Sequence, residues 1–221
     1  MARRAATRSQ KREEGLAYSN TWFQSGAQAA WETAPPAEPS LVEMLAGRVD
    51  TYLEIGLCEG QSMRWVLETL KPRRAVAVDL YEPPRERHRA SYERHERNAR
   101  ANLAPWIESG QLTLVKSASQ DWLRTDACHA LVPDNSVQFA YVDGSHIAWD
   151  CLADLVLVLP KLVRRTGNAP GGIMAVDDLH RRWHMGRPLV RVAVQAFLAA
   201  YENRVRVVFW RGRHCAIERV R

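Results

Sequence analysis

Two patterns of apolar residues alternate along the chain. The first is a short run of valine, alanine, isoleucine and leucine, which predicts a buried strand. Such runs begin at Thr51 and occupy 74–79, 112–116, 137–143 and 171–177. The second pattern places an apolar residue at every third or fourth position, which predicts helices over 61–70, 147–162 and 189–201. A polar helix with a solvated, charged face is predicted over 82–102. Strands that alternate with helices predict one open α/β sheet.

Each end of this alternating region carries a further signal. Ser40, followed three residues later by Glu43, predicts a capping box at the start of a short helix. Near the C-terminus, β-rich runs at 205–210 and 214–219 are separated by Arg-Gly-Arg, which predicts a hairpin.

The chemistry is organised around the stretch from Tyr52 to Ser62, which reads as a strand, a glycine turn and the start of a helix. Gly56 and Gly60 allow a tight turn and the close approach of a ligand, and the helix start favours an anionic group. A dinucleotide site has the pattern G-x-G-x-x-G. Cys58 stands where its middle glycine would be, which weakens the NAD hypothesis. A purely structural turn remains the alternative at this point.

The run at 74–79 ends in Asp79, which lies 25 positions after Glu54. A carboxylate at that distance from a glycine turn can accept hydrogen bonds from both ribose hydroxyls of a nucleoside. The alternative is an aspartate that caps the next helix. The spacing favours the ribose.

Composition limits the class of protein. A chain of 221 residues suits one large domain or two small ones. Its longest apolar run, 152–159, contains Asp154, which predicts no membrane helix. The four cysteines are widely spaced without a C-x-x-C pair, which predicts a cytoplasmic location and no zinc site.

The net charge of +6 is partly concentrated at the N-terminus. Residues 1–16 are therefore predicted to be a disordered basic tail, either simply solvated or in contact with a polyanion. Residues 17–221 are predicted to form the functional domain, beginning with an aromatic arm around Trp22 and Phe23.

The ordered motifs resemble the class I S-adenosylmethionine (SAM) methyltransferases, in the bacterial branch similar to catechol and macrolide-sugar O-methyltransferases. The matching residues are Glu54, Gly56, Gly60, Ser62, Asp79, Asp143-Gly144-Ser145-His146, Gly171-Gly172 and Asp177-Asp178. The family implies a Rossmann-like, doubly wound, seven-stranded sheet with its last strand antiparallel. It also implies that SAM contacts Glu54, Gly56, Gly60, Ser62, Asp79, Ser117, Ala118 and Asp143. Lys116-Ser117 replaces an acidic pair often found there in the family.

The resemblance also implies a magnesium ion held by Asp143, Asp177 and Asp178. Three carboxylates at neighbouring strand ends can hold one hard cation, which would orient an acceptor oxygen. The alternative is that these aspartates cap loops and position substrate without metal. Asp143, His146 and His180 are the candidate catalytic residues, with His146 the favoured base.

We therefore predict a SAM-dependent methyltransferase that acts on an oxygen of a small molecule. The alternatives are a methyltransferase for nucleic acid or protein, a noncatalytic nucleoside-binding protein of the same fold, and an NAD-dependent oxidoreductase. The absence of an Asn-Pro-Pro-Tyr type motif makes DNA an unlikely acceptor. The oligomeric state is left open between a monomer and a homo-oligomer.

Overall fold

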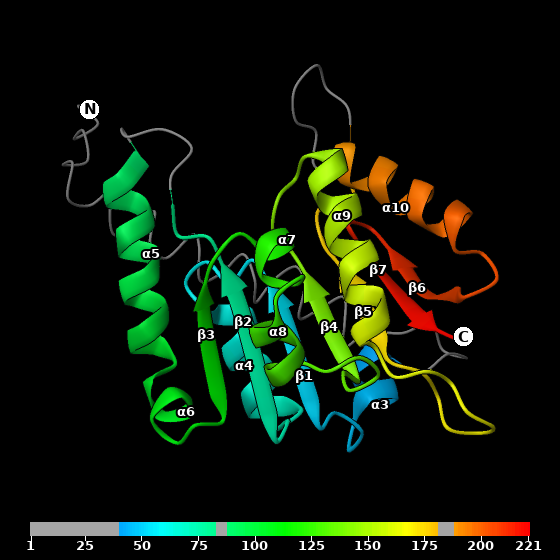
Figure 1. Cartoon of the computed structure of the whole chain (residues 1–221), viewed down its shortest axis with the longest axis horizontal. Helices are drawn as coiled ribbons and strands as arrows, with labels where there is room; N and C mark the ends of the chain where they lie inside the picture. The colour runs from blue at the N-terminus through cyan, green and yellow to red at the C-terminus, as the bar shows by residue number, and fades with distance from the viewer. Residues whose placement is uncertain (1–39, 83–87, 181–187) are drawn as a thin grey trace, which may run out of the picture.

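The computed structural model describes residues 40–82, 88–180 and 188–221. The strands within these ranges form one seven-stranded sheet (Figure 1). The strand order is β3-β2-β1-β4-β5-β7-β6. All neighbouring pairs are parallel except β5–β7 and β6–β7. The strands are β1 (Thr51–Ile55), β2 (Arg74–Asp79), β3 (Leu112–Lys116), β4 (Phe139–Val142), β5 (Ile173–Val176), β6 (Val205–Arg211) and β7 (His214–Arg219).

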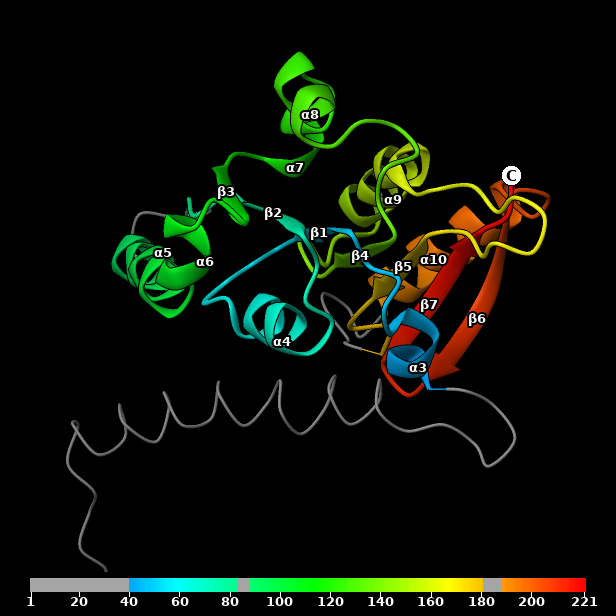
Figure 2. The same ribbon diagram turned by 90° about the horizontal axis from the view of Figure 1, so that it is seen from below.

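Helices cover both faces of the sheet (Figure 2). One face packs against α7 (Ser119–Trp122), α8 (Asp126–Leu131), α9 (Ala148–Val158) and α10 (Leu189–Ala200). The other packs against α3 (Leu41–Leu45), α4 (Gln61–Thr69), α5 (Arg89–Asn102) and α6 (Ala104–Glu108). A 3-10 turn, Leu159–Lys161, continues α9. None of the helices in these described ranges is long and apolar enough to cross a membrane.

The central strands are buried on both sides, as a sheet between two helical layers requires. In β1, Leu53 and Ile55 belong to the core under α9 and α10, whereas Tyr52 belongs to the core under α3 and α4. The two-residue period of a strand sends alternate side chains to opposite faces. The same alternation determines toward which face of the sheet each polar residue at a strand end points.

The parallel register brings the predicted site residues to one edge of the sheet. Ile55 pairs with both Val78 and Val142, and Val142 pairs with Val176. The residues that follow or end these strands, Gly56, Asp79, Asp143 and Asp177, therefore lie side by side at the carboxyl edge. Backbone hydrogen bonds fix this alignment, including Gly56 N to Val78 O at 2.9 Å and Asp143 N to Ile55 O at 2.8 Å.

The predicted fold class, sheet size and antiparallel strand are confirmed. Strands β2 and β3 have the predicted bounds, and the capping box of Ser40 and Glu43 is present. The predicted helix over 82–102 is helical from Arg89, and residues 83–87 are not described. Helices α6, α7 and α8 were not predicted. The predicted tail and aromatic arm lie outside the described residues.

Candidate active site

The loop between β1 and α4 depends on two glycines. Gly56 has a φ of +87°, and a Cβ added there would lie 2.5 Å from the carbonyl carbon of Asp143. Gly60, with a φ of +82°, is the N-cap of α4. Both conformations strongly favour glycine. The loop therefore passes directly against the end of β4 and leaves a bare backbone at the carboxyl edge, where an anionic ligand can approach the first turn of α4.

Asp79 ties this loop to the end of β2. Its Oδ2 accepts a hydrogen bond from the backbone N–H of Cys58 at 2.8 Å, and its Oδ1 accepts from that of Tyr81 at 2.9 Å. The Tyr81 hydroxyl donates back to the carbonyl of Cys58 at 3.0 Å. A carboxylate offers about four lone-pair sites, so Asp79 keeps acceptor capacity for ribose hydroxyls while its orientation is fixed.

Glu54 lies fully buried beneath the loop. It accepts hydrogen bonds from the hydroxyls of Tyr52, at 2.7 Å, and Ser62. Burial raises the pKa of Glu54 to about 8, an effect that these two hydrogen bonds only partly offset. The structure thus brings the predicted residues Glu54 and Ser62 into contact. Their hydrogen bond joins β1 to the first turn of α4 beneath the loop.

The turn after β3 adjoins the end of β2, where the backbone N–H of Ser117 donates to the carbonyl of Asp79 at 3.0 Å. Ser117 and Ala118 therefore lie at the same edge as the ribose candidate. Next to them, Ser119 donates to Asp154 of α9 at 2.6 Å. Asp154 is a buried carboxylate whose pKa burial raises to about 6. The sequence indicates the contact between Ser119 and Asp154 only through the presence of an acidic residue, Asp154, within an otherwise apolar helix.

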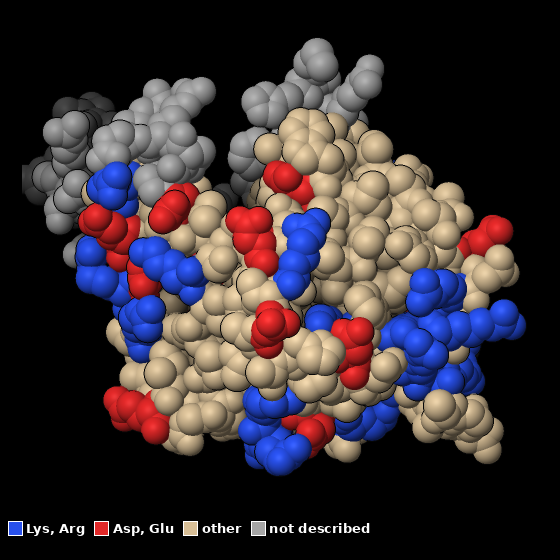
Figure 3. All heavy atoms as spheres, viewed as in Figure 1, with Lys and Arg blue, Asp and Glu red and all other residues tan. Residues whose placement is uncertain are grey.

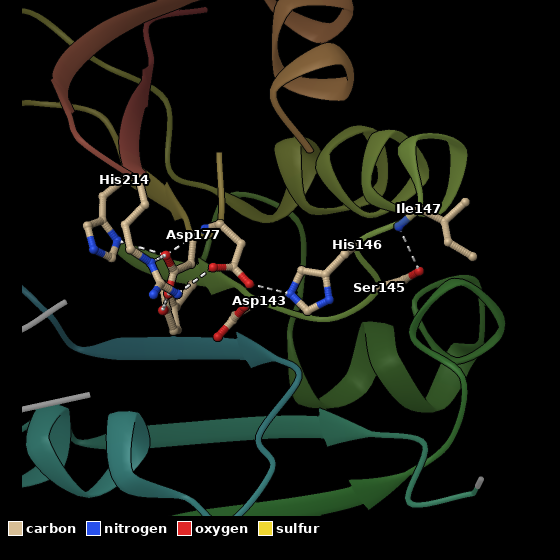
Figure 4. A network of polar contacts seen from close by, with 9 residues as sticks. Asp143, Ser145, His146, Ile147, Asp177 and His214 are labelled. Atoms are coloured by element: carbon tan, nitrogen blue, oxygen red, sulfur yellow. Dashed lines mark hydrogen bonds and ion pairs between the residues drawn. The ribbon is translucent and has the colours of Figure 1, made fainter. Parts of the chain in front are cut away.

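Asp143, His146 and Asp178 form a polar cluster at the ends of β4 and β5 (Figure 4). Nε2 of His146 lies 2.8 Å from Oδ2 of Asp178 and 3.6 Å from Oδ1 of Asp143. Burial lowers the pKa of His146, but its interactions with the two aspartates outweigh burial and raise the pKa to about 9. Burial, with a contribution from Asp177 and Asp178, raises the pKa of Asp143 to about 6.

Asp177 contacts other side chains, of which Arg213 also contacts Asp178. Arg213 donates to both oxygens of Asp177, with Nε–Oδ1 at 2.7 Å and Nη2–Oδ2 at 2.8 Å. The Tyr141 hydroxyl donates to Oδ2 at 2.9 Å, and Nδ1 of His214 lies 3.1 Å from Oδ1. Figure 4 shows Asp177 beside His214 and on the side of the cluster away from His146.

Arg213 and His214 were missed as site residues. The sequence does indicate where these two residues lie, because an antiparallel last strand must begin at the carboxyl edge, where the parallel strands end. His180, predicted as a second base, is exposed. Among the described residues it makes no hydrogen bond or ion pair with Asp143 or His146.

The predicted magnesium ligands are only partly brought together. Within the described ranges, Asp143, His146 and Asp178 are the residues whose ligand atoms lie within 4.8 Å of one another. Asp177 is not in this group. Mg²⁺ prefers oxygen ligands in nearly ideal octahedral geometry. The present set fits Mg²⁺ poorly, because it contains the His146 imidazole and because the Asp178 carboxylate already contacts Arg213 and His146.

A family model described as a methyltransferase domain matches residues 53–179, more than half of the chain. No curated protein matches significantly. Among solved structures, an O-methyltransferase from Bacillus cereus in complex with SAH is 16% identical with a TM-score of 0.55, over 92% of this chain and 90% of that one.

Two other solved structures are similar at the level of the fold. The O-methyltransferase NovP is 18% identical with a TM-score of 0.50, over 78% of this chain and 72% of that one. An rRNA methylase from Streptococcus thermophilus is 10% identical with a TM-score of 0.54, over 82% of this chain and 95% of that one. These proteins are described as O-methyltransferases and as an rRNA methylase, so the shared fold does not by itself specify the acceptor.

Proposed function

Because the chain belongs to the methyltransferase domain family whose model matches residues 53–179, we propose that it transfers a methyl group from SAM to an oxygen atom of a small molecule. One observation carries the proposal. The register of β1, β2 and β4 aligns the glycine loop, Asp79 and Asp143 at a single edge of the sheet. A methyl donor and an acceptor group can therefore meet there.

The residues at this edge suit SAM. The bare backbone at Gly56, closed against Asp143, would hold the amino-acid end of the cofactor. Asp79 would accept the ribose hydroxyls, and Ser117 and Ala118 would border the adenine. When bound, SAM supplies a methyl group on a positively charged sulfur, which an oxygen nucleophile can attack.

The chain must also remove a proton from the acceptor hydroxyl. Asp143, with a pKa of about 6, is ionised at neutral pH and can accept it. His146, with a pKa of about 9, is protonated there and can donate a hydrogen bond instead. We therefore assign the base to Asp143 and the orienting group to His146, which reverses the order expected from the sequence. The two groups titrate as a coupled pair.

On the face seen in Figure 3, basic side chains gather over α5, where acidic side chains lie among them, and also where β6 and β7 lie in Figure 1. Arg164 and Arg204 act electrostatically on Arg219, which ends β7 beside Gly172 at the start of β5. The group at β6 and β7 thus lies at the amino edge of the parallel strands, opposite the site, and would not guide a polyanion to Asp143.

We leave magnesium out of the proposed mechanism because Asp177 and Asp178 already contact Arg213. We retain the proposal of a cytoplasmic location, which the four free cysteines support.

An acceptor screen tests the reaction. The full chain would be incubated with methyl-labelled SAM and separate pools of phenols, sugars and short RNA, with SAH release as the readout. Label in an oxygen of a small molecule supports the proposal. Label only in RNA, or only in the chain itself, contradicts it.

A further inference from the structure

We propose that Arg213 takes the place that a divalent cation would occupy between the acidic residues, so that these residues bind no divalent cation. Arg213 comes directly before β7 and reaches both aspartates at the end of β5. Its two hydrogen bonds to Asp177 leave Nη2 close enough to Asp178 Oδ1 for a second ion pair, at 2.5 Å. One guanidinium thus bridges two carboxylates.

The acceptor sites of Asp177 are filled. Oδ1 accepts from Arg213 and from the backbone N–H of Asp178 at 2.5 Å, and lies 3.1 Å from His214. Oδ2 accepts from Arg213 and Tyr141. A carboxylate has about four lone-pair sites. A metal ion could bind Asp177 only by displacing one of these donors, and the side chain is only 5% exposed.

Asp178 is engaged in the same way. Its Oδ1 contacts Arg213 and its Oδ2 contacts His146, 2.8 Å away. A planar guanidinium matches paired carboxylate oxygens in a fixed geometry that a lysine cannot reproduce. The repulsion between adjacent buried carboxylates is therefore offset by side chains of the protein.

The backbone holds Arg213 in this position. Its carbonyl accepts a hydrogen bond from the backbone N–H of Leu179 at 3.0 Å, so the hairpin is tied to the loop that follows β5. Gly212 supplies the turn with a φ of +51°, and Asp178 adopts a φ of +60°. The Arg213 side chain is therefore held by the turn at its backbone end and by two carboxylates at its guanidinium end. It supplies a positive charge at a fixed position.

The role of Arg213 is to position Asp178, and through it His146, at the carboxyl edge where the acceptor would bind. Only this part of the inference rests on the proposed function. The claim that Arg213 fills the cation position can be tested without SAM or an acceptor.

The test compares the wild type with Arg213→Met, Arg213→Lys and a control, Arg206→Met. Arg206 pairs with Glu218 on the same hairpin, with Nε and Oε2 2.5 Å apart. Melting temperatures would be measured in chelator and in millimolar Mg²⁺ or Mn²⁺, and bound Mn²⁺ would be counted by electron paramagnetic resonance.

We expect no cation effect on the wild type or on Arg206→Met. Arg213→Met should melt lower in chelator and regain about 2–4 °C with Mn²⁺, which corresponds to roughly 1 kcal/mol for a chain of this size. Arg213→Lys should retain part of the stability without metal.

Two results would overturn the inference. One is a wild-type protein that binds Mn²⁺ tightly and loses this binding in Asp178→Asn. The other is an Arg213→Met variant that gains no cation response. If Arg213→Met does not fold, Arg213→Gln replaces it, and the wild-type measurement still decides.

Discussion

Oδ2 of Asp79 accepts a hydrogen bond from the backbone N–H of Cys58 across 2.8 Å, so the end of β2 holds the loop that follows β1. The same carboxylate is the proposed ribose acceptor. Its orientation is therefore set before a ligand arrives, which reduces the entropy lost on binding.

Asp79→Ala should weaken SAM binding by about ten- to a hundredfold. Hydrogen bonds to a charged group contribute on the order of 1.5–3 kcal/mol, and 1.4 kcal/mol is a factor of ten. Asp50→Ala is a matched control, because Asp50 pairs with Arg73 just before β1, at the opposite end of that strand. Calorimetry would measure both. Equal SAM affinities of Asp79→Ala and Asp50→Ala would show that Asp79 does not contribute to SAM binding.

Gly56→Ala should destabilise the fold more than Gly110→Ala. Both glycines have positive φ, +87° and +77°, but a Cβ at Gly110 would meet nothing within 4 Å. Gly110→Ala should therefore cost roughly 1–2 kcal/mol from backbone strain alone. Gly56→Ala should cost more than about 3 kcal/mol, because the methyl group also displaces the backbone of Asp143. Urea denaturation would measure the difference, and similar losses would show that the loop does not need this close approach.

Glu54 should make the fold less stable as the pH rises. Its pKa is about 8 in the folded chain and ordinarily 4.5, so the folded state binds the proton more tightly. This contribution is fully present below pH 4.5 and is lost as the pH rises through about 8. The loss is at most about 1.4 kcal/mol per pH unit. In Glu54→Gln the slope over this window should be smaller than in the wild type. Parallel pH profiles would contradict a protonated Glu54.

Asp143→Asn should lower turnover at saturating SAM by about 10²–10⁴-fold, the usual contribution of a general base. Asp134→Asn, which alters an exposed partner of Lys161, is the control. Kinetics with an acceptor from the screen would test this. Asp143→Asn turnover equal to that of the control would mean that another group removes the proton.

The sequence was sufficient for features set by local pattern. The apolar runs of β2 and β3 have sharp polar boundaries, and the parallel alignment of strand ends places Gly56, Asp79 and Asp143 together. Helix α7 was missed because its four residues are too few to display a helical period. The Arg213–Asp177 pair was missed because 36 residues separate its members and only the antiparallel β7 joins them.

Calorimetric titration of the full chain with SAM, SAH and NAD⁺ tests the proposed methyltransferase function most directly. We predict saturable binding of SAM and SAH, weakened in Asp79→Ala, and little binding of NAD⁺. Tight binding of NAD⁺ with no binding of SAM or SAH would contradict it.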